Sequence, residues 1–178
     1  MATRPGDQKT VSLEELTPDA PAALCAQARE LLLEYGRFVV TQPGAAQFCY
    51  GSLEKEAARL PFSYHEQGGG CMIAWVNNAL AGFVAWRPLA ASAQVAPDAW
   101  ELKRLWVRSE ARGLGLGRSL TQAVLDRARA ARRRAVYLDT APAAMASAYR
   151  IYIDMKFVPC AAYNDNPVQG LAYLVKFL

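Results

Sequence analysis

Residues 100–120, WELKRLWVRSEARGLGLGRSL, join a strand pattern to a glycine-rich turn and the start of a helix. Charged and apolar residues alternate over 101–107, glycines recur in the run 112–117, and an apolar helical stripe begins at Leu116. Glycines leave backbone N–H groups uncovered, and the first turn of a helix leaves N–H groups unpaired under a partial positive charge. The segment therefore predicts an anion site whose natural occupant is a phosphate-bearing ligand.

The two sides of this turn predict a strand and an amphipathic helix. Alternation over 101–107 separates two faces, which are Glu101, Lys103, Leu105 and Val107 on one side and Leu102, Arg104 and Trp106 on the other. After the turn, an apolar stripe repeats every four residues at Leu116, Leu120, Val124 and Ala128. Residues 135–138 form an apolar strand, and the intervening helix predicts a right-handed parallel crossover between the two strands.

Earlier residues predict a strand, two helices and a hairpin. The strand covers 10–13, a helix follows from Ala22 to a stop at Gly36, and a turn at Pro43-Gly44 leads to a second helical segment closed by Pro61. Apolar residues of that segment are Phe48, Leu53 and Leu60. We expect the connection between these two helices to lie at a free edge, where a substrate would bind. Strands 71–76 and 81–86 form a hairpin, and 88–97 is an expected loop.

Later residues predict a helix and a closing hairpin. Thr140 and Pro142 mark the helix start, and a +3, +4, +3 repeat through Met145, Ala148, Tyr152 and Met155 turns Tyr152 inward. Strands at 157–163 and 171–178, joined by a turn at 164–167, form an antiparallel pair at the end of the sheet.

Composition predicts one soluble domain spanning 1–178, with a frayed segment at 1–8. The net charge of +4 is concentrated at 127–134, which we interpret as the basic end of a helix and not as a nucleic-acid surface. No apolar run is long enough to span a membrane. The four cysteines are scattered and there is one histidine, which predicts no metal, no disulfide and a cytoplasmic location.

These patterns together resemble the GNAT superfamily of N-acetyltransferases. The run 112–117 resembles the family's acetyl-CoA loop, 101–107 the strand before it, and 151–157, IYIDMKF, the family's Tyr-containing helix end. The likeness is good over 70–178, and the first 60 residues match only in their order of elements. Lys156 replaces the family's glycine, and Met145 stands where Asn is frequent. The Tyr163–Pro167 turn resembles an uncharacterised bacterial subgroup.

The resemblance implies an α/β fold: a mostly antiparallel sheet of six to seven strands, a central parallel pair splayed at the cofactor site, and about four helices. Residues 70–178 would form the cofactor-binding core and 9–61 the acceptor side. Acetyl-CoA would be the co-substrate, and the expected contacts to it are Leu105, Trp106, Val107, Arg112, Gly113, Leu114, Gly115, Leu116, Gly117, Arg118 and Tyr152. The acceptor would be an amine of a small molecule or peptide, and the protein a monomer or homodimer.

The chemistry of acetyl transfer predicts roles for Glu101 and Tyr152. An amine attacks the thioester directly through a tetrahedral intermediate, which requires a proton acceptor and a proton donor. Glu101 aligns with the family's general base; its alternatives are an ion pair with Lys103 or Arg104, or binding of a cationic substrate. A glutamate pKa of about 4.3 lies far below an amine's, about 10.4, so a water chain or a raised pKa would be needed.

Tyr152 is the expected acid for the leaving thiolate, with Tyr149 as a substitute and a buried core tyrosine as the alternative. Asp165, in the final turn, is an expected contact for a cationic amine, although a polar turn residue is the ordinary explanation. Two other functions remain open. One is a regulatory domain that binds acyl-CoA without catalysis, and the other a dinucleotide-binding fold, which Leu120 disfavours because it occupies the position of the last fingerprint glycine.

Overall fold

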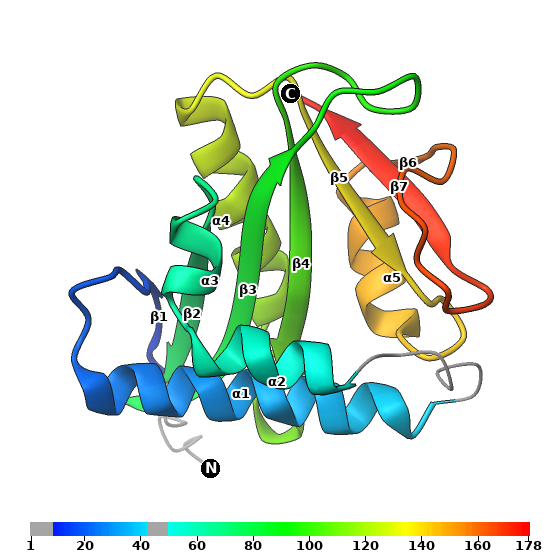
Figure 1. Ribbon diagram of the computed structural model, residues 1–178. Helices are drawn as coiled ribbons and strands as arrows, with labels where there is room; N and C mark the ends of the chain where they lie inside the picture. Colours follow the sequence, from blue (N-terminus) through cyan, green and yellow to red (C-terminus); the bar gives the residue numbers. More distant parts are fainter. Residues whose placement is uncertain (1–8, 43–49) are drawn as a thin grey trace, which may run out of the picture.

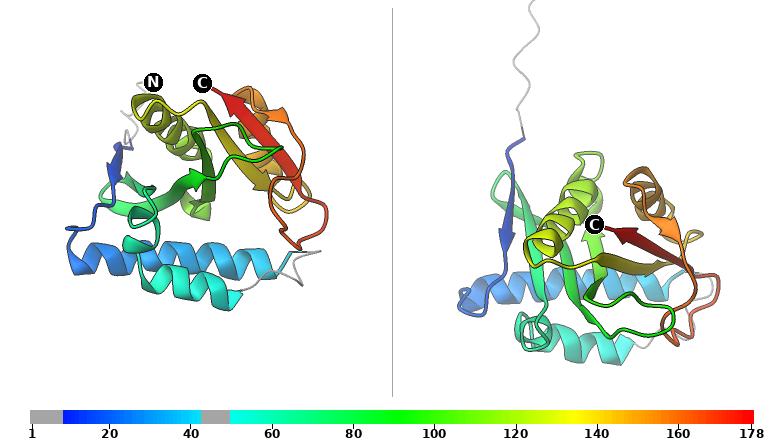
Figure 2. Two further views of the ribbon diagram at one scale, coloured as in Figure 1. Left: turned by 45° about the horizontal axis from the view of Figure 1, so that its top comes forward. Right: turned by 90° about the horizontal axis from the view of Figure 1, so that it is seen from above.

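A seven-stranded mixed sheet lies between two layers of helices in the computed structural model, which describes residues 9–42 and 50–178 (Figures 1 and 2). The strands are β1 (Val11–Glu15), β2 (Gly70–Val76), β3 (Ala79–Leu89), β4 (Ala99–Val107), β5 (Ala135–Thr140), β6 (Val158–Pro159) and β7 (Ala172–Phe177). The helices are α1 (Ala22–Val40), α2 (Tyr50–Ala58), α3 (Phe62–His65), α4 (Leu116–Ala130) and α5 (Ala146–Asp154), with a short 3-10 helix η2 (Ser109–Ala111).

The strand order is β1-β2-β3-β4-β5-β7-β6, and β4 and β5 are parallel, whereas the other neighbours are antiparallel. This confirms the predicted mixed sheet, its central parallel pair and its closing hairpin. Helices α1, α2 and α3 cover one face, and α4 and α5 cover the other (Figure 2). Each face has its own buried cluster, one under α1 and α2 and a second under α4 and α5.

Helix α4 has the predicted amphipathic pattern. Leu116, Leu120, Val124 and Ala128 are all at most 1% exposed, so the stripe faces the core. The basic run lies where we expected a helix end, because Arg127 and Arg129 occupy the last turn of α4, where cations suit the helix dipole.

The prediction that Gly36 ends the first helix is wrong, because α1 continues to Val40. Gly36 is buried inside the helix, and a Cβ built on it would lie 2.2 Å from Leu53 Cδ2 and 2.7 Å from Tyr50 Cε2. The glycine therefore permits close packing of α1 on α2. The predicted frayed segment at 1–8, the turn at Pro43-Gly44, and Phe48 and Cys49 lie outside the described residues.

Three other predicted boundaries are wrong. Helix α5 begins at Ala146, since Ala144 and Met145 both donate to Ala141 O and close a turn before it. Strand β3 runs to Leu89, which pairs with Ala99, and this shortens the predicted loop. Strand β6 has only two residues, Val158 and Pro159, although Cys160 N still donates to Tyr173 O of β7 at 2.9 Å.

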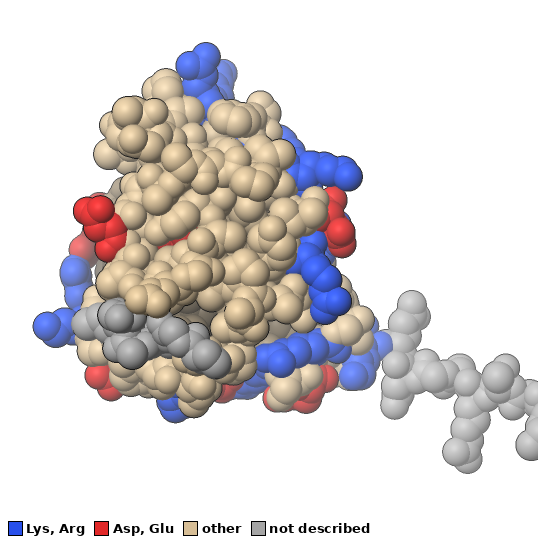
Figure 3. Space-filling view, turned by 90° about the vertical axis from the view of Figure 1, so that its right-hand side faces the viewer, with Lys and Arg blue, Asp and Glu red and all other residues tan. Residues whose placement is uncertain are grey.

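The side that carries β7 presents mostly uncharged side chains, with Lys and Arg gathered mainly at its margin (Figure 3). Val158 of β6 and Phe177 of β7 are 49% and 63% exposed. Within 9–42 and 50–178, no helix is both long and apolar enough to cross a membrane. Cys25, Cys71 and Cys160 are free thiols. The oligomeric state and the cytoplasmic location stay predictions.

Candidate active site

A bulge in β4 shifts the side chains of its second half. Ala85 pairs with Lys103 while Phe83 pairs with Trp106, so β4 has an extra residue there, and Arg104 has a φ of 60°. The predicted alternation is therefore wrong beyond Lys103. Leu102 and Leu105 both pack into the cluster under α4, whereas Arg104 and Trp106 turn to the side of α1 and α2.

Strands β4 and β5 diverge soon after they begin. Their parallel pairing covers only Ala99–Glu101 and residues 135–137, and Figure 1 shows the two strands separating below that point. In the described chain, β4 has no strand partner on its β5 side after Glu101. The backbone groups of 102–107 that point away from β3 therefore face an opening in the sheet, as the predicted splay requires. Near its far end, Arg112 Nε donates to Val107 O at 3.3 Å.

The glycine-rich turn forms one wall of a cavity of about 460 Å³ in this opening. Gly113 and Gly115 have φ values of 82° and 77°, a conformation that side chains disfavour, and no atom would obstruct a Cβ at either position. Gly115 precedes α4 without any side-chain cap. The first N–H groups of α4 are therefore available to an anion.

Most of the predicted cofactor contacts lie together around this cavity, and we therefore call it the donor cavity. The residues on its wall are Leu105, Trp106, Val107, Arg112, Gly113, Gly115, Leu116, Gly117 and Arg118. Leu114 and Tyr152 are not among them: Leu114 packs against the core, and Tyr152 lies elsewhere. Arg112 lies over the Trp106 ring at 5.3 Å, and Arg118 pairs with Asp154 at 3.1 Å on the surface.

A second cavity, of about 270 Å³, lies between β4, α1, the end of β5, α5 and residues 166–168. We call it the acceptor cavity, because residues of the predicted acceptor side line it. It shares the wall residues Leu105, Ala144, Met145 and Ala148 with the donor cavity. A group bound along β4 in the first can therefore reach the second. Tyr35 of α1 and Ser52 of α2 line the acceptor cavity, so the N-terminal helices form part of its wall.

Tyr152 lines the acceptor cavity and is 4% exposed. Its ring meets Phe157 edge-on at 5.6 Å. Burial raises the pKa of the Tyr152 phenol well above its usual range, and the nearby Tyr35 and Asp139 raise it further. Tyr152 thus stays protonated and can donate a hydrogen bond into the cavity. Tyr149 packs against the core instead and does not line either cavity.

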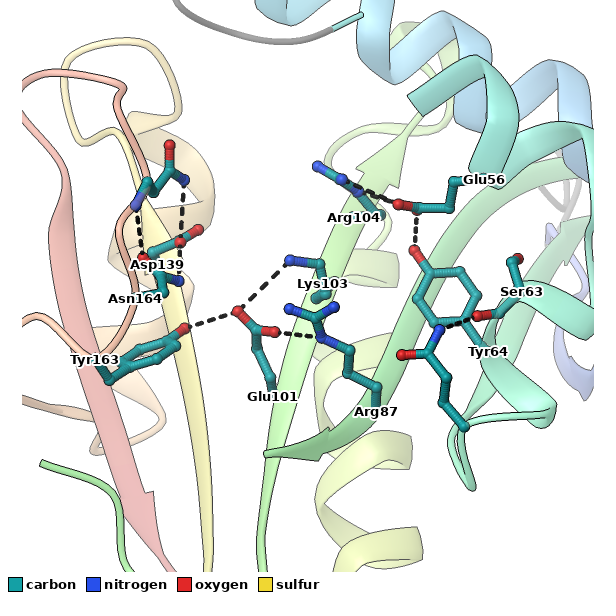
Figure 4. A network of polar contacts seen from close by, with 12 residues as sticks. Glu56, Ser63, Tyr64, Arg87, Glu101, Lys103, Arg104, Asp139, Tyr163 and Asn164 are labelled. Carbon is teal, nitrogen blue, oxygen red and sulfur yellow. Dashed lines mark hydrogen bonds and ion pairs between the residues drawn. The ribbon is translucent and has the colours of Figure 1, made fainter. Parts of the chain in front are cut away.

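Glu101 is 1% exposed and does not line either cavity. Its Oε2 accepts from Arg87 Nε at 2.7 Å, its Oε1 accepts from the Tyr163 hydroxyl at 3.2 Å, and Lys103 Nζ lies 3.5 Å from Oε1 (Figure 4). The structure therefore brings Glu101 to Lys103, one of the two ion-pair partners expected as an alternative to a base, and not to Arg104.

Arg104 instead meets α2 across the cavity wall. Its Nε and Nη2 donate to the two oxygens of Glu56, each at 3.1 Å, and Glu56 also accepts from the Tyr64 hydroxyl (Figure 4). Burial alone would raise the pKa of Glu56, but Arg104 outweighs it and the pKa lies below its usual range. This pairing fixes α2 against β4.

Asp139, which the sequence did not single out, lines the acceptor cavity from β5. Its Oδ2 accepts from Asn164 Nδ2 at 2.9 Å and from Asn166 Nδ2 at 3.2 Å (Figure 4). Asp165, the predicted substrate contact, is exposed and does not line either cavity. The signal available in the sequence for Asp139 was its position at the C-terminal end of a strand of the predicted parallel pair, because ligands bind at such ends.

Lys103 also lines the acceptor cavity, and its side chain is 17% exposed. Burial lowers the pKa of its ammonium, although Glu101 acts in the opposite direction. Among the described residues, no group of three or more His, Cys, Asp or Glu side chains is placed to hold a metal ion.

The splayed parallel pair with an uncapped glycine turn at one end is the arrangement that the sequence predicts for an acetyltransferase. A model of the acetyltransferase (GNAT) family matches residues 28–157, and the chain belongs to this family. No curated protein sequence matches the chain.

Solved structures share the fold at low identity. PaiA N-acetyltransferase from Thermoplasma acidophilum, in complex with coenzyme A, is 12% identical with a TM-score of 0.70, over 95% of this chain and 99% of that one. YncA from Salmonella typhimurium, with acetyl-CoA, is 17% identical with a TM-score of 0.65, over 94% of each chain. Ribosomal-protein-alanine N-acetyltransferase from Brucella melitensis is 19% identical with a TM-score of 0.69, over 94% of this chain and 99% of that one.

Lys156, one of the two departures from the family pattern, lies in a left-handed backbone conformation. Lys156 has a φ of 65°, the left-handed conformation that a glycine at this position would adopt without strain. A lysine there costs roughly 1 kcal/mol, which one residue of a packed helix end can tolerate. Met145, the other departure, lies on the wall shared by the two cavities.

Proposed function

We propose that this protein transfers the acetyl group of acetyl-CoA to a primary amine. The observation that carries the proposal is the meeting of the two cavities at Leu105, Met145 and Ala148, in the opening that follows the end of the β4–β5 pairing. One cavity has the features of a phosphate-binding turn, and the other has charged walls suited to an acceptor.

The donor cavity suits the charge and the length of coenzyme A. Unpaired N–H groups at the start of α4, with Arg112 and Arg118, would hold the pyrophosphate. The exposed backbone edge of β4 over 105–107 would bind the pantetheine amides and orient the thioester carbonyl. The acetyl group would then lie at the wall shared with the acceptor cavity.

In the transfer, the amine nitrogen attacks the thioester carbonyl, a C–N bond forms and the C–S bond breaks. The ammonium form of the acceptor gives up two protons in total, one to solvent and one to the thiol of coenzyme A. Tyr152, on the acceptor wall, is the donor we assign to the leaving sulfur. Burial raises the pKa of Tyr152, so its hydroxyl stays protonated and is available to donate a hydrogen bond to the leaving sulfur.

Glu101 is a less suitable base than the sequence suggests, since three groups already occupy its oxygens. Asp139 lines the cavity itself, and we assign it the contact to the incoming ammonium. The carboxylate would hold the ammonium group in place, and the ammonium would give up its proton to water before the amine attacks.

Calorimetric titration of the full chain with acetyl-CoA and with NAD tests the donor site, and release of free thiol with a panel of amines tests the reaction. We expect acetyl-CoA to bind, NAD not to bind, and thiol release to require an amine. Binding of NAD in place of acetyl-CoA would refute the proposal. Binding of acetyl-CoA with no acetyl transfer to any amine would favour the regulatory alternative.

Two glycine variants separate the binding role of the turn from backbone strain. Gly115 and Gly68 have nearly equal φ values, 77° and 78°, but Gly68 lies outside both cavities. Alanine at either position should cost about 1–2 kcal/mol of stability. Only Gly115→Ala should also weaken acetyl-CoA binding, by about tenfold if a similar free energy is lost from the site. Equal affinities in the two variants would contradict the assignment of the turn.

A further inference from the structure

We propose that the acceptor is a free amino acid, recognised as a zwitterion: Asp139 binds its ammonium group and Lys103 binds its carboxylate. This inference rests on the proposed function and specifies the substrate class of the acceptor cavity. It follows from two oppositely charged side chains on the two strands that diverge around that cavity.

Asp139 is held as a fixed acceptor with unused capacity. Both amide donors, Asn164 Nδ2 and Asn166 Nδ2, bind its Oδ2, and no hydrogen bond among the described residues ends on its Oδ1. No cationic side chain in the described chain lies within 4.0 Å of this carboxylate. A carboxylate in a cavity without an ion-pair partner is suited to bind a cationic ligand.

The neighbouring backbone fixes the direction of both amides. Asn164 Oδ1 accepts from Asn166 N at 3.2 Å, and Asn166 Oδ1 accepts from Val168 N at 3.1 Å. Because each amide oxygen is engaged, each NH₂ group is directed at Asp139, and Figure 4 shows this for Asn164. The 164–168 turn therefore acts as a support for one carboxylate.

The opposite wall carries excess positive charge. Glu101 is a single carboxylate shared by two cations, Arg87 at 2.7 Å and Lys103 at 3.5 Å. Arg104, which also lines the cavity, is matched by Glu56. The group around Glu101 thus keeps one net positive charge, and Lys103 is the member of it that lines the cavity. A lysine ammonium has three donors and can bind Glu101 and a ligand carboxylate together.

Charge and size together favour a free amino acid over a protein N-terminus. An amino acid presents both charges on a small body, so it can satisfy Asp139 and Lys103 at once. A peptide N-terminus presents the amine next to an uncharged amide and leaves Lys103 unmatched. The volume of about 270 Å³ lies below the usual range of about 300–1,000 Å³ for ligand pockets, which suits a single amino acid.

The test compares each of the twenty amino acids with its own carboxamide, which keeps the amine and removes the carboxylate charge. Thiol release is measured with the full chain at saturating acetyl-CoA. We expect at least one amino acid to be acetylated with kcat/KM about 100-fold above that of its amide, which is the size of effect expected when a hydrogen bond to a charged group is lost. Amides, simple alkylamines or peptide N-termini reacting as well as the amino acids would overturn the inference.

Two further outcomes would contradict different proposals. Acetyl-CoA binding with no turnover of any amino acid also overturns this inference. Failure of acetyl-CoA to bind refutes the proposed function itself. The two failures are therefore separated by the calorimetric titration, which does not involve an acceptor.

Substitutions of Lys103 and Asp139 test which residue binds the carboxylate and which binds the ammonium group of the amino acid. Lys103→Met should lower the amino-acid-to-amide ratio of kcat/KM from about 100 towards one, and Lys103→Arg should restore part of it. Asp139→Asn should lower kcat/KM for amino acid and amide alike, since both carry the ammonium. Lys9→Met, at an exposed position, is the control and should keep the wild-type ratio. A Lys103→Met enzyme that binds acetyl-CoA and retains the full ratio would overturn the role of Lys103.

Discussion

Glu101 and Asp139 are two carboxylates on neighbouring strands with different surroundings. Glu101 is buried and engaged by Arg87, Lys103 and Tyr163, whereas Asp139 lines a cavity and is held by two amides. The family resemblance singled out Glu101 as a candidate base, because its strand and its distance from the glycine turn are features of the sequence. The sequence did not reveal that Arg87 and Tyr163, 14 and 62 residues away, occupy its oxygens.

The surroundings of Glu101 predict that it stabilises the fold. Glu101→Gln leaves Arg87 and Lys103 without their shared counter-charge, and we expect the free energy of unfolding to fall by about 3 kcal/mol. Urea unfolding measures it, with Glu54→Gln, on the exposed side of α2, as a control that should change stability by less than about 0.5 kcal/mol. A stable Glu101→Gln protein that binds acetyl-CoA but has lost kcat would instead support the role of base.

Tyr152 is predicted to act in the chemical step. Tyr152→Phe removes the hydroxyl on the acceptor wall while keeping the ring that packs on Phe157. We expect kcat to fall about 100-fold, at the lower end of the range for a lost general acid, with acetyl-CoA affinity unchanged. Tyr149→Phe is the matched control, since Tyr149 does not line either cavity. Unchanged turnover in Tyr152→Phe would remove this residue from the mechanism.

Among the elements, regular patterns were predictable and local exceptions were not. The stripe of α4 and the hairpin of β2 and β3 follow the periods of a helix and a strand, so the sequence predicts them. The bulge at Arg104 inserts one residue into β4 without any glycine or proline to mark it. A strict two-residue period therefore assigns Leu105 to the wrong face of β4. It also misplaces the boundary between the walls of the donor cavity and the acceptor cavity.

Gly36 is the clearest case of an element misread from a single residue. Gly36→Ala would place a Cβ 2.2 Å from Leu53 Cδ2, and Leu53 is fully buried. Overpacking costs typically about 1–3 kcal/mol and the gain in helix propensity is about 1 kcal/mol, so we expect a net loss of about 1 kcal/mol. Since α2 carries Glu56, which holds Arg104, a shift of this helix should also raise KM for the acceptor.

Gly51→Ala gives the opposite expectation in the neighbouring helix. Gly51 lies in α2, and nothing lies within 4 Å of a Cβ added there. Alanine should raise the free energy of unfolding by about 0.4–1 kcal/mol, because it restricts the unfolded chain without a clash. Denaturant unfolding of both variants provides the comparison. Gly36→Ala as stable as Gly51→Ala would contradict the proposed close packing of α1 on α2.

For the whole molecule, the fold class was predictable and the acceptor cavity was not. The order of strands and helices around the glycine turn is enough to predict the splayed sheet, because connection rules restrict the possible topologies. The acceptor cavity combines residues from α1, α2, β4, β5, α5 and the 164–168 turn. Few of these residues belong to a local motif, so their meeting depends on the packing of the complete chain.

The same topology makes one prediction about the response of the molecule to its donor. Strands β1 to β4 and strands β5 to β7 are joined within the sheet by only three residue pairs, Ala99–Glu101 with residues 135–137. The donor cavity has walls from both parts, since β4 and the start of α4 face Ser147 and Ile151 of α5. A ligand that fills it contacts both parts and binds only the folded state, which stabilises that state by about 2.7 kcal/mol at 100 times its dissociation constant.

Hydrogen exchange measures this effect at individual segments. With coenzyme A at about 100 times its dissociation constant, amide exchange should slow at residues 105–107, at 113–118 and in α5, because these segments line the cavity or pair with the ligand. Strand β1 lies at the far edge of the sheet and lines neither cavity, so it serves as the internal control. The amides of β1 that exchange through local opening should exchange at an unchanged rate. Protection confined to 113–118 would mean that the ligand binds only at the helix start, and the thioester would then not reach the wall shared with the acceptor cavity.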